Sequence, residues 1–239
     1  GGASAYTSIP PAPHWQLDHN GAYLHYTVNE TIGGVEFHWL PEVQGMPLVA
    51  DMTSMILSRP VDVSRYALIY AAAQKNIGIA GLTLVIVRHD VLCDPPAGTP
   101  SMLDYHGHIK AHSVFNTPPV FAWYVAGKIL AWIKSEGGIV AFGERNRRKA
   151  SKLYELIDES SFYLSRVDRA CRSWMNVPFK LADPGLEAAF LQQSAAEGLV
   201  GLAGHRSVGG IRASLYNAMP EAGVQALADF MREFERSRA

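Results

Sequence analysis

A single lysine lies between two short apolar segments of the sequence. Residues 67–72 (ALIYAA) and 82–87 (LTLVIV) are rich in β-forming residues, and Lys75 is the one charge in the segment that joins them. Apolar runs of this length, bounded by turn residues, predict buried strands. An amine enclosed between such strands tends to lose its proton, and a neutral amine is a nucleophile toward carbonyl carbons. Because lysines are seldom buried, this segment by itself favours a solvated turn lysine.

A carboxylate stands at the end of another apolar run. Residues 47–50 (PLVA) stop at Asp51. Open α/β sheets bind ligands at the carboxyl ends of their strands, so we expect Asp51 and Lys75 to face one crevice. A Schiff-base lysine, with an acid that pairs with a pyridinium nitrogen, is what pyridoxal phosphate chemistry needs. The position of Asp51 after a strand is equally typical of the N-cap residue of a following helix.

The composition describes an ordinary globular protein. Of 239 residues, 48% are hydrophobic and 18% charged. The formal net charge is -1, so the composition has no excess of positive charge that would indicate binding to nucleic acid or to an anionic membrane. Cys93 and Cys171 lie far apart without CxxC spacing, which argues against a disulfide framework or a zinc knuckle. The sequence has no apolar run of membrane-spanning length and no apolar signal core. We therefore expect a cytoplasmic protein.

Strand and helix signals alternate along the chain and predict an α/β fold. We expect a boundary near residue 136, with residues 1–136 in a larger α/β domain and residues 137–239 in a smaller α+β domain. Strands are expected over 22–27, 35–40, 47–50, 67–72, 82–87, 174–181 and 208–216, the second of them more exposed. Helices are expected over 118–136, 140–158, 184–199 and 220–238. The first helix is apolar on nearly every side, which predicts burial in the core or against a partner subunit.

Five motifs, in this order along the chain, resemble one known family. They are VADMTS around Asp51, AAAQKNIG around Lys75, FNTPP at 115–119, GHR at 204–206 and GGIRASLYNAMP at 209–220. The chain from about His14 to its C-terminus resembles the phosphoserine aminotransferases, which are pyridoxal phosphate enzymes of fold type I in the class-V aminotransferase group. The resemblance implies part of the large cofactor-binding α/β domain in residues 1–136 and the small domain in residues 137–239.

The resemblance also implies which residues hold the cofactor. Lys75 would be the Schiff-base lysine and would move a proton. Asp51 would pair with the pyridine nitrogen, and Thr31 would bond the ring's hydroxyl oxygen. The resemblance further implies that Gln74 contacts the cofactor. Asn116 and Thr117 would reach across a homodimer interface to the phosphate of the partner's cofactor. From the residues alone, Thr117 is also a helix N-cap, with Pro118 at the first helical position.

Substrate contacts are implied in the C-terminal half. Arg212 would hold the α-carboxylate as a bidentate fork, which a lysine cannot do. His205 and Arg206 would meet the substrate's phosphate group from the neighbouring subunit. Without the resemblance, Arg206 and Arg212, on either side of Gly209 and Gly210, are more typical of exposed ion-pair formers.

The activity implied by the resemblance is ping-pong transfer of an amino group from L-glutamate to 3-phosphohydroxypyruvate, giving O-phospho-L-serine and 2-oxoglutarate. The implied roles are in serine and pyridoxine biosynthesis. One alternative is another class-V aminotransferase, against which His205 and Arg206 argue because a substrate without phosphate needs no second anion clamp. The other is an inactive fragment that serves only as a folded, dimerising module. The family has a further N-terminal third, with the glycine-rich phosphate turn, that the opening GGASAYTSIPP does not resemble.

Two other groups of residues have simpler explanations. The spacing of His106, His108 and His112 permits a metal site, but the segment predicts a loop with Asp104 as its one acid, so no metal is expected. The second predicted helix carries a basic stretch whose acidic surroundings predict a solvated face. Its members are Arg145, Arg147, Arg148, Lys149 and Lys152.

Overall fold

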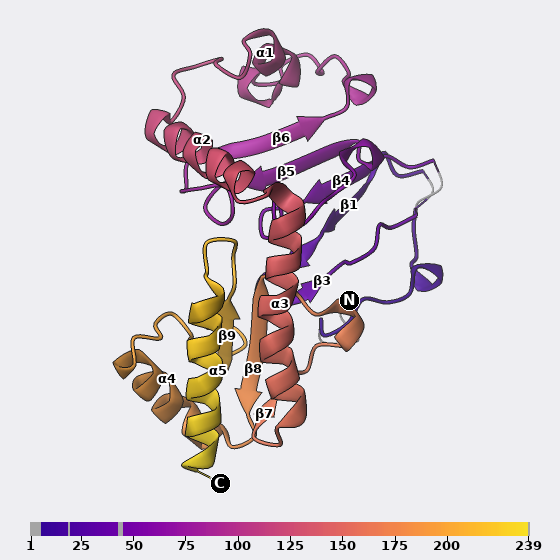
Figure 1. Cartoon of the computed structure of the whole chain (residues 1–239). Helices are drawn as coiled ribbons and strands as arrows, with labels where there is room; N and C mark the ends of the chain where they lie inside the picture. The colour runs from indigo at the N-terminus through magenta and orange to yellow at the C-terminus, as the bar shows by residue number, and fades with distance from the viewer. Residues whose placement is uncertain (1–5, 19, 43–44, 239) are drawn as a thin grey trace.

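A four-stranded sheet and a three-stranded sheet occupy different parts of the chain (Figure 1). The computed structural model describes residues 6–18, 20–42 and 45–238. In the larger sheet the order is β1-β4-β5-β6. The strands β1 (Leu24–Thr27), β4 (Leu48–Asp51) and β5 (Leu68–Ala72) are parallel, and β6 (Thr83–Val87) is antiparallel to β5. The predicted strands around Lys75 are therefore confirmed.

The three parallel strands end at nearly the same level, with β5 running two residues beyond the other two. Asp51 is in register with Thr27 on one side and with Tyr70 on the other. The segments that leave these carboxyl ends, at 28–31, 52–58 and 73–79, consequently meet along one edge of the sheet. Such an edge is where open α/β sheets bind their ligands.

The smaller sheet consists of β7 (Tyr163–Leu164), β8 (Asn176–Leu181) and β9 (Ile211–Ser214), all antiparallel. The helices α3 (Gly138–Glu159), α4 (Glu187–Ala196) and α5 (Glu221–Arg236) pack around it (Figure 1). The predicted apolar face of α5 is confirmed, since each of its members is buried: Val224, Leu227, Ala228, Met231 and Phe234.

Two hydrophobic clusters form the interior. One surrounds the larger sheet and includes Met52, Ile69 and Ala126, and the other fills the space between the smaller sheet and its helices. This α/β arrangement is the fold class expected from the sequence. The division of the chain into two domains near residue 136 stays a prediction.

The second predicted strand is shorter and more buried than expected. β3 covers only Val35–Glu36, and both residues are buried. It pairs with β2 (Asn29–Glu30). The apolar pattern continues past Glu36, but the Phe37 amide donates to the Val28 carbonyl (2.8 Å) and the Phe37 carbonyl accepts from Arg59 Nη2 (2.7 Å). The Phe37 amide thus continues the β2–β3 register by one bond, and the ladder stops there because the Phe37 carbonyl accepts from Arg59 instead of from a strand partner.

Two further expectations fail at helix starts. Residues predicted as loop form the short helix α1 (Tyr105–Lys110), because the Asp104 carboxylate accepts from the His106 amide (2.9 Å). The helix predicted from Pro118 is α2 (Val120–Ser135), with Pro119 at the N-cap position and no side-chain cap. Thr117 is therefore not the N-cap.

The last predicted strand and the third predicted helix have different bounds from those expected. β9 begins only at Ile211, because Gly209 and Gly210 take left-handed backbone angles (φ 67° and 71°) that break an extended strand. The predicted helix over 184–199 is a 3₁₀ turn, Pro184–Leu186, followed by α4.

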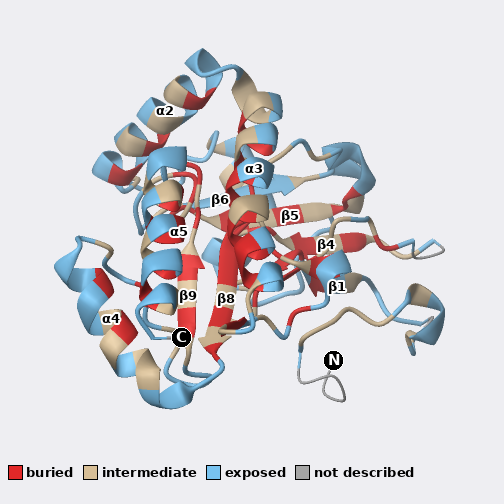
Figure 2. Cartoon of the chain, turned by 60° about the horizontal axis from the view of Figure 1, so that its bottom comes forward, coloured by how far each residue is buried: buried red, intermediate tan, exposed pale blue. Residues whose placement is uncertain are grey.

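Helix α2 packs on the larger sheet through Ala126, and much of its surface is exposed (Figure 2). Its buried positions are Ala122, Ala126 and Ile133. Its exposed apolar residues are Val120, Phe121, Trp123, Tyr124 and Leu130. Burial of the whole helix in the core is therefore wrong, and contact with a partner subunit stays a prediction. Within the described ranges, no helix is long and apolar enough to cross a membrane.

Candidate active site

Lys75 lies in the tight turn that follows β5. The turn is closed by a hydrogen bond from the Gly78 amide to the Ala73 carbonyl (2.7 Å). Gly78 packs against α2, where an added Cβ would lie 3.5 Å from the Ala126 nitrogen, and Gly81 has a φ of 108°. The two glycines thus let the chain reverse closely under α2 and hold Lys75 at the sheet edge.

The Lys75 amine is half-buried and has a polar partner. Its Nζ donates to Thr31 Oγ1 (2.6 Å) and lies 6.0 Å from the centre of the Tyr216 ring. Burial lowers the pKa of Lys75 below its ordinary value; the negative charge of Asp51 opposes this shift, and the positive charge of Arg212 adds to it. Lys75 is therefore not the fully solvated turn lysine that its own segment favours, and burial makes its proton easier to lose.

Asp51 ends β4 and faces the same edge. Its Oδ1 accepts from the Thr53 amide (2.8 Å), which caps the turn after the strand. No α-helix follows in residues 52–58, so Asp51 is not a helix N-cap. Burial raises the pKa of Tyr70 and the Asp51 carboxylate raises it further, while His25 Nε2 lies 3.0 Å from the Tyr70 hydroxyl.

Arg212 brings a second cation to this edge from the smaller sheet. It lies in β9, and its Nη1 donates to the Thr31 carbonyl (3.4 Å). Its Nε is buried without a hydrogen-bond partner among the described residues. A guanidinium with an unused buried donor is suited to bind a carboxylate.

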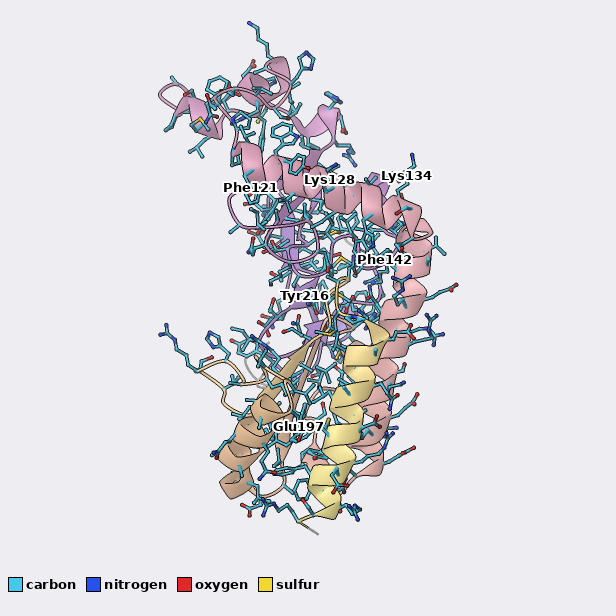
Figure 3. The ribbon with its side chains drawn as sticks, turned by 60° about the vertical axis from the view of Figure 1, so that its left-hand side comes forward. Phe121, Lys128, Lys134, Phe142, Glu197 and Tyr216 are labelled. Atoms are coloured by element: carbon cyan, nitrogen blue, oxygen red, sulfur yellow. The ribbon has the colours of Figure 1, made fainter. Side chains whose placement is uncertain are left out.

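Two neighbours of Lys75 were missed by sequence reasoning. Tyr216 follows β9 and lies at the junction of the two parts of the molecule (Figure 3), where its hydroxyl accepts from Asn176 Nδ2 (3.3 Å). Glu30 accepts from the Ile32 and Gly33 amides and so bends the chain at Thr31. Tyr216 stands inside the GGIRASLYNAMP motif, so the motif itself was the available signal.

The structure thus brings together Thr31, Asp51, Lys75 and Arg212. Five other predicted residues make no hydrogen bond to this cluster in the part of the chain that the structure describes: Gln74, Asn116, Thr117, His205 and Arg206. All are exposed except His205, which is half-buried and bonds Ser207 Oγ (2.7 Å). Their predicted roles, most of them toward a partner's site, stay predictions.

The histidines of α1 are engaged locally. His106 Nδ1 lies 3.4 Å from Asp104 Oδ1, and His108 Nε2 lies 3.1 Å from the Met102 carbonyl oxygen. Among the described residues, no group of three histidine, cysteine or acidic side chains is arranged to hold a metal.

The lowered pKa predicts how Lys75 titrates. We expect reductive ¹³C-methylation followed by a nuclear magnetic resonance pH titration to place the Lys75 midpoint below 10.5. The sign follows from desolvation, which disfavours the ammonium and lets the proton leave at lower pH. The exposed Lys110 in the same sample provides the reference signal. A Lys75 midpoint at or above that of Lys110 would contradict the prediction.

The sequence matches the family model described as "Aminotransferase class-V" over residues 9–227. It is 54% identical to the phosphoserine aminotransferase of Nitrosomonas europaea, an alignment that covers 99% of this chain and 67% of that protein. It is 55% identical to the same enzyme of Hahella chejuensis, covering 97% of this chain and 64% of the relative. The chain thus spans about two thirds of the length of the curated relatives it matches.

A solved structure agrees with these matches. The fold superimposes on phosphoserine aminotransferase from Bacillus circulans subsp. alkalophilus with a TM-score of 0.96 at 48% identity, covering 100% of this chain and 66% of that one. The mixed sheet with flanking helices is therefore the fold of these pyridoxal phosphate enzymes.

Proposed function

The chain belongs to the class-V aminotransferase family, and we propose that it acts as a phosphoserine aminotransferase with pyridoxal phosphate as cofactor. In this proposal an amino group passes from L-glutamate to 3-phosphohydroxypyruvate, giving O-phospho-L-serine and 2-oxoglutarate, in serine and pyridoxine biosynthesis. The observation that carries the proposal is the half-buried Lys75 amine, bonded to Thr31 and close enough to Asp51 and Arg212 for their charges to act on it.

The groups at the sheet edge fit this cofactor. Lys75 offers an amine with a lowered pKa, Asp51 a carboxylate, and Thr31 a hydroxyl. These are the groups that would hold an aldehyde, a ring nitrogen and a ring hydroxyl. We propose Gln74, Asn116 and Thr117 as further cofactor contacts, the last two toward the partner's cofactor.

Bound pyridoxal phosphate would supply an aldehyde carbon and an electron-withdrawing ring. Lys75 Nζ would act as nucleophile and then as base, taking a proton from the substrate's α-carbon and delivering it to the carbon that the cofactor's aldehyde supplies. Asp51 would hold a proton on the ring nitrogen. The unused Nε of Arg212 would bind the substrate carboxylate, and the Thr31 hydroxyl would keep the Lys75 amine in place.

Substrate choice and assembly belong to the same proposal. His205 and Arg206, on the loop before β9, would bind the substrate's phosphate from the neighbouring subunit. Gly204 allows that loop to close, because a Cβ there would lie 2.1 Å from the Gly209 carbonyl oxygen. The exposed apolar face of α2 supports a homodimer. We also propose a cytoplasmic location, which agrees with two free cysteines, Cys93 and Cys171.

Borohydride reduction in the presence of pyridoxal phosphate tests the proposal. We expect one adduct, mapped by peptide mass spectrometry to Lys75, and formation of 2-oxoglutarate from glutamate and 3-phosphohydroxypyruvate. An adduct without amino transfer to the phosphorylated keto acid would support either another class-V activity or the inactive module. Assays with keto acids that lack a phosphate would distinguish these two, since only another class-V aminotransferase would transfer an amino group to one of them. Equal labelling of Lys75 and the exposed Lys110 would contradict the proposal.

A further inference from the structure

One lysine of α3 is buried, against the expectation of a solvated face. Lys149 is 1% exposed, and its Nζ donates to three main-chain carbonyl oxygens, those of Leu215, Tyr216 and Met219, each at 2.9 Å. Burial, with the charge of Arg145, lowers the pKa of Lys149 to about 8. An ammonium has three donors, so Lys149 uses all of them on one short turn.

This turn, residues 215–219, is the segment that places Tyr216 beside Lys75. The turn is closed by a bond from the Met219 amide to the Tyr216 carbonyl (2.9 Å). It is tied to the residue before β8 by the Leu215 amide, which donates to the Met175 carbonyl (2.7 Å). The Tyr216 carbonyl accepts from Lys149, while the Tyr216 ring lies 6.0 Å from Lys75 Nζ. Lys149 therefore holds the backbone of the residue whose side chain covers the Lys75 amine.

The same turn also supports the residue that follows Lys75. The Asn217 amide donates to Asn76 Oδ1 (3.0 Å), and Asn217 Nδ2 donates to the Leu57 carbonyl (2.9 Å). Asn146, which precedes Lys149 by about one helical turn, donates to Asn217 Oδ1 (2.8 Å). Leu57 has a φ of 63°, an angle that is costly for a leucine and needs such support.

We propose that Lys149 is a positioning residue for the candidate active site: by binding three carbonyls of the 215–219 turn, it keeps Tyr216 over the Lys75 amine and Asn217 under Asn76. The inference rests on the proposed function only in that Lys75 is taken as the reactive amine. Its consequence is that the turn, and not the sheet edge alone, keeps Lys75 partly shielded from water.

The test is the titration of Lys75 in the chain without added cofactor. In Lys149→Met the turn loses its three bonds, water reaches Lys75, and the midpoint of its ¹³C-methyl titration rises. We expect the neutral fraction of Lys75 at a fixed pH below 8, where Lys149 is still an ammonium, to fall about threefold or more. Because the readout needs neither cofactor nor catalysis, its failure is distinct from a failure of the proposed activity.

Two variants separate positioning from charge and from folding. Tyr216→Leu removes the covering ring without changing any charge, and we expect it to raise the Lys75 midpoint as well. Lys152→Met makes the same substitution on α3, where Lys152 bonds Gln225 of α5 instead of the turn, and we expect no change. An unchanged Lys75 midpoint in folded Lys149→Met overturns the inference. If Lys149→Met does not fold, Lys149→Gln, which keeps a donor for the turn, is titrated in its place: a raised Lys75 midpoint supports the inference and an unchanged one overturns it.

Discussion

Replacing Lys75 by alanine is expected to abolish the borohydride-trapped adduct and to lower amino transfer by about 10⁴-fold or more, to the level of background. The reason is that no other amine is placed at the carboxyl ends of β1, β4 and β5 among the described residues. In the proposed function Lys75 would be both the nucleophile and the group that moves the proton, so its loss would remove two functions at once. The measurements are peptide mass spectrometry after reduction and the rate of 2-oxoglutarate formation.

Two controls make this result specific. Lys75→Arg keeps the positive charge but offers no neutral amine at neutral pH, so it should lose the adduct as completely as Lys75→Ala. Lys110→Ala removes an exposed lysine and should leave both readouts unchanged. If the protein were only a dimerising module, Lys75→Ala would keep its mass in solution and the unsubstituted chain would form no adduct. An adduct retained in Lys75→Ala would refute the assignment of the reactive amine.

The strands around Lys75 were predictable because their signals are local. Residues 67–72 and 82–87 are short apolar runs bounded by turn residues, and the structure places β5 and β6 within one residue of them. The strand predicted over 35–40 is shorter than expected, because its apolar pattern continues beyond the point at which its backbone groups stop pairing with a neighbouring strand. There the Phe37 carbonyl is bonded by Arg59, a contact across more than twenty residues that no local pattern records.

The candidate site was only partly predictable, and for the same reason. The bond between Lys75 and Thr31 joins segments that are distant in sequence and meet only because parallel strands end at nearly the same level. The burial of Lys149, in contrast, had a local signal. It shares one face of α3 with Phe142, Asn146 and Leu153, all buried at helical spacing. The charges beside it in sequence concealed that periodicity.

The second large expected effect concerns stability. Glu36 is fully buried, and its Oε1 accepts from Arg59 Nε at 3.2 Å, with side-chain exposures of 0% and 19% respectively. Its other oxygen accepts from the Trp174 amide (2.9 Å). The pair thus ties β3 to the segment leading into β8, which makes Glu36 a buried charge with one cationic partner among the described residues.

Arg59→Ala is expected to lower the free energy of unfolding by about 3–5 kcal/mol, because it leaves the Glu36 carboxylate buried without a counter-charge. It also removes the bond from Arg59 Nη2 to the Phe37 carbonyl. Chemical denaturation followed by circular dichroism measures the change. Arg65→Ala, which removes an exposed arginine from the same loop, should stay within about 0.5 kcal/mol of the unsubstituted chain.

A double variant distinguishes the unpaired charge from the loss of packing. In Arg59→Ala with Glu36→Gln the buried charge is gone, while the amide oxygen can still accept from the Trp174 amide. The double variant should therefore be more stable than Arg59→Ala alone. If it is equally unstable, the arginine acts through its packing on Trp174, whose ring centre lies 6.0 Å from the guanidinium carbon, and the electrostatic account is wrong. If the double variant is more stable than Arg59→Ala, the Glu36–Arg59 pair holds β3 in place, and with it the turn between β2 and β3 that contains Thr31.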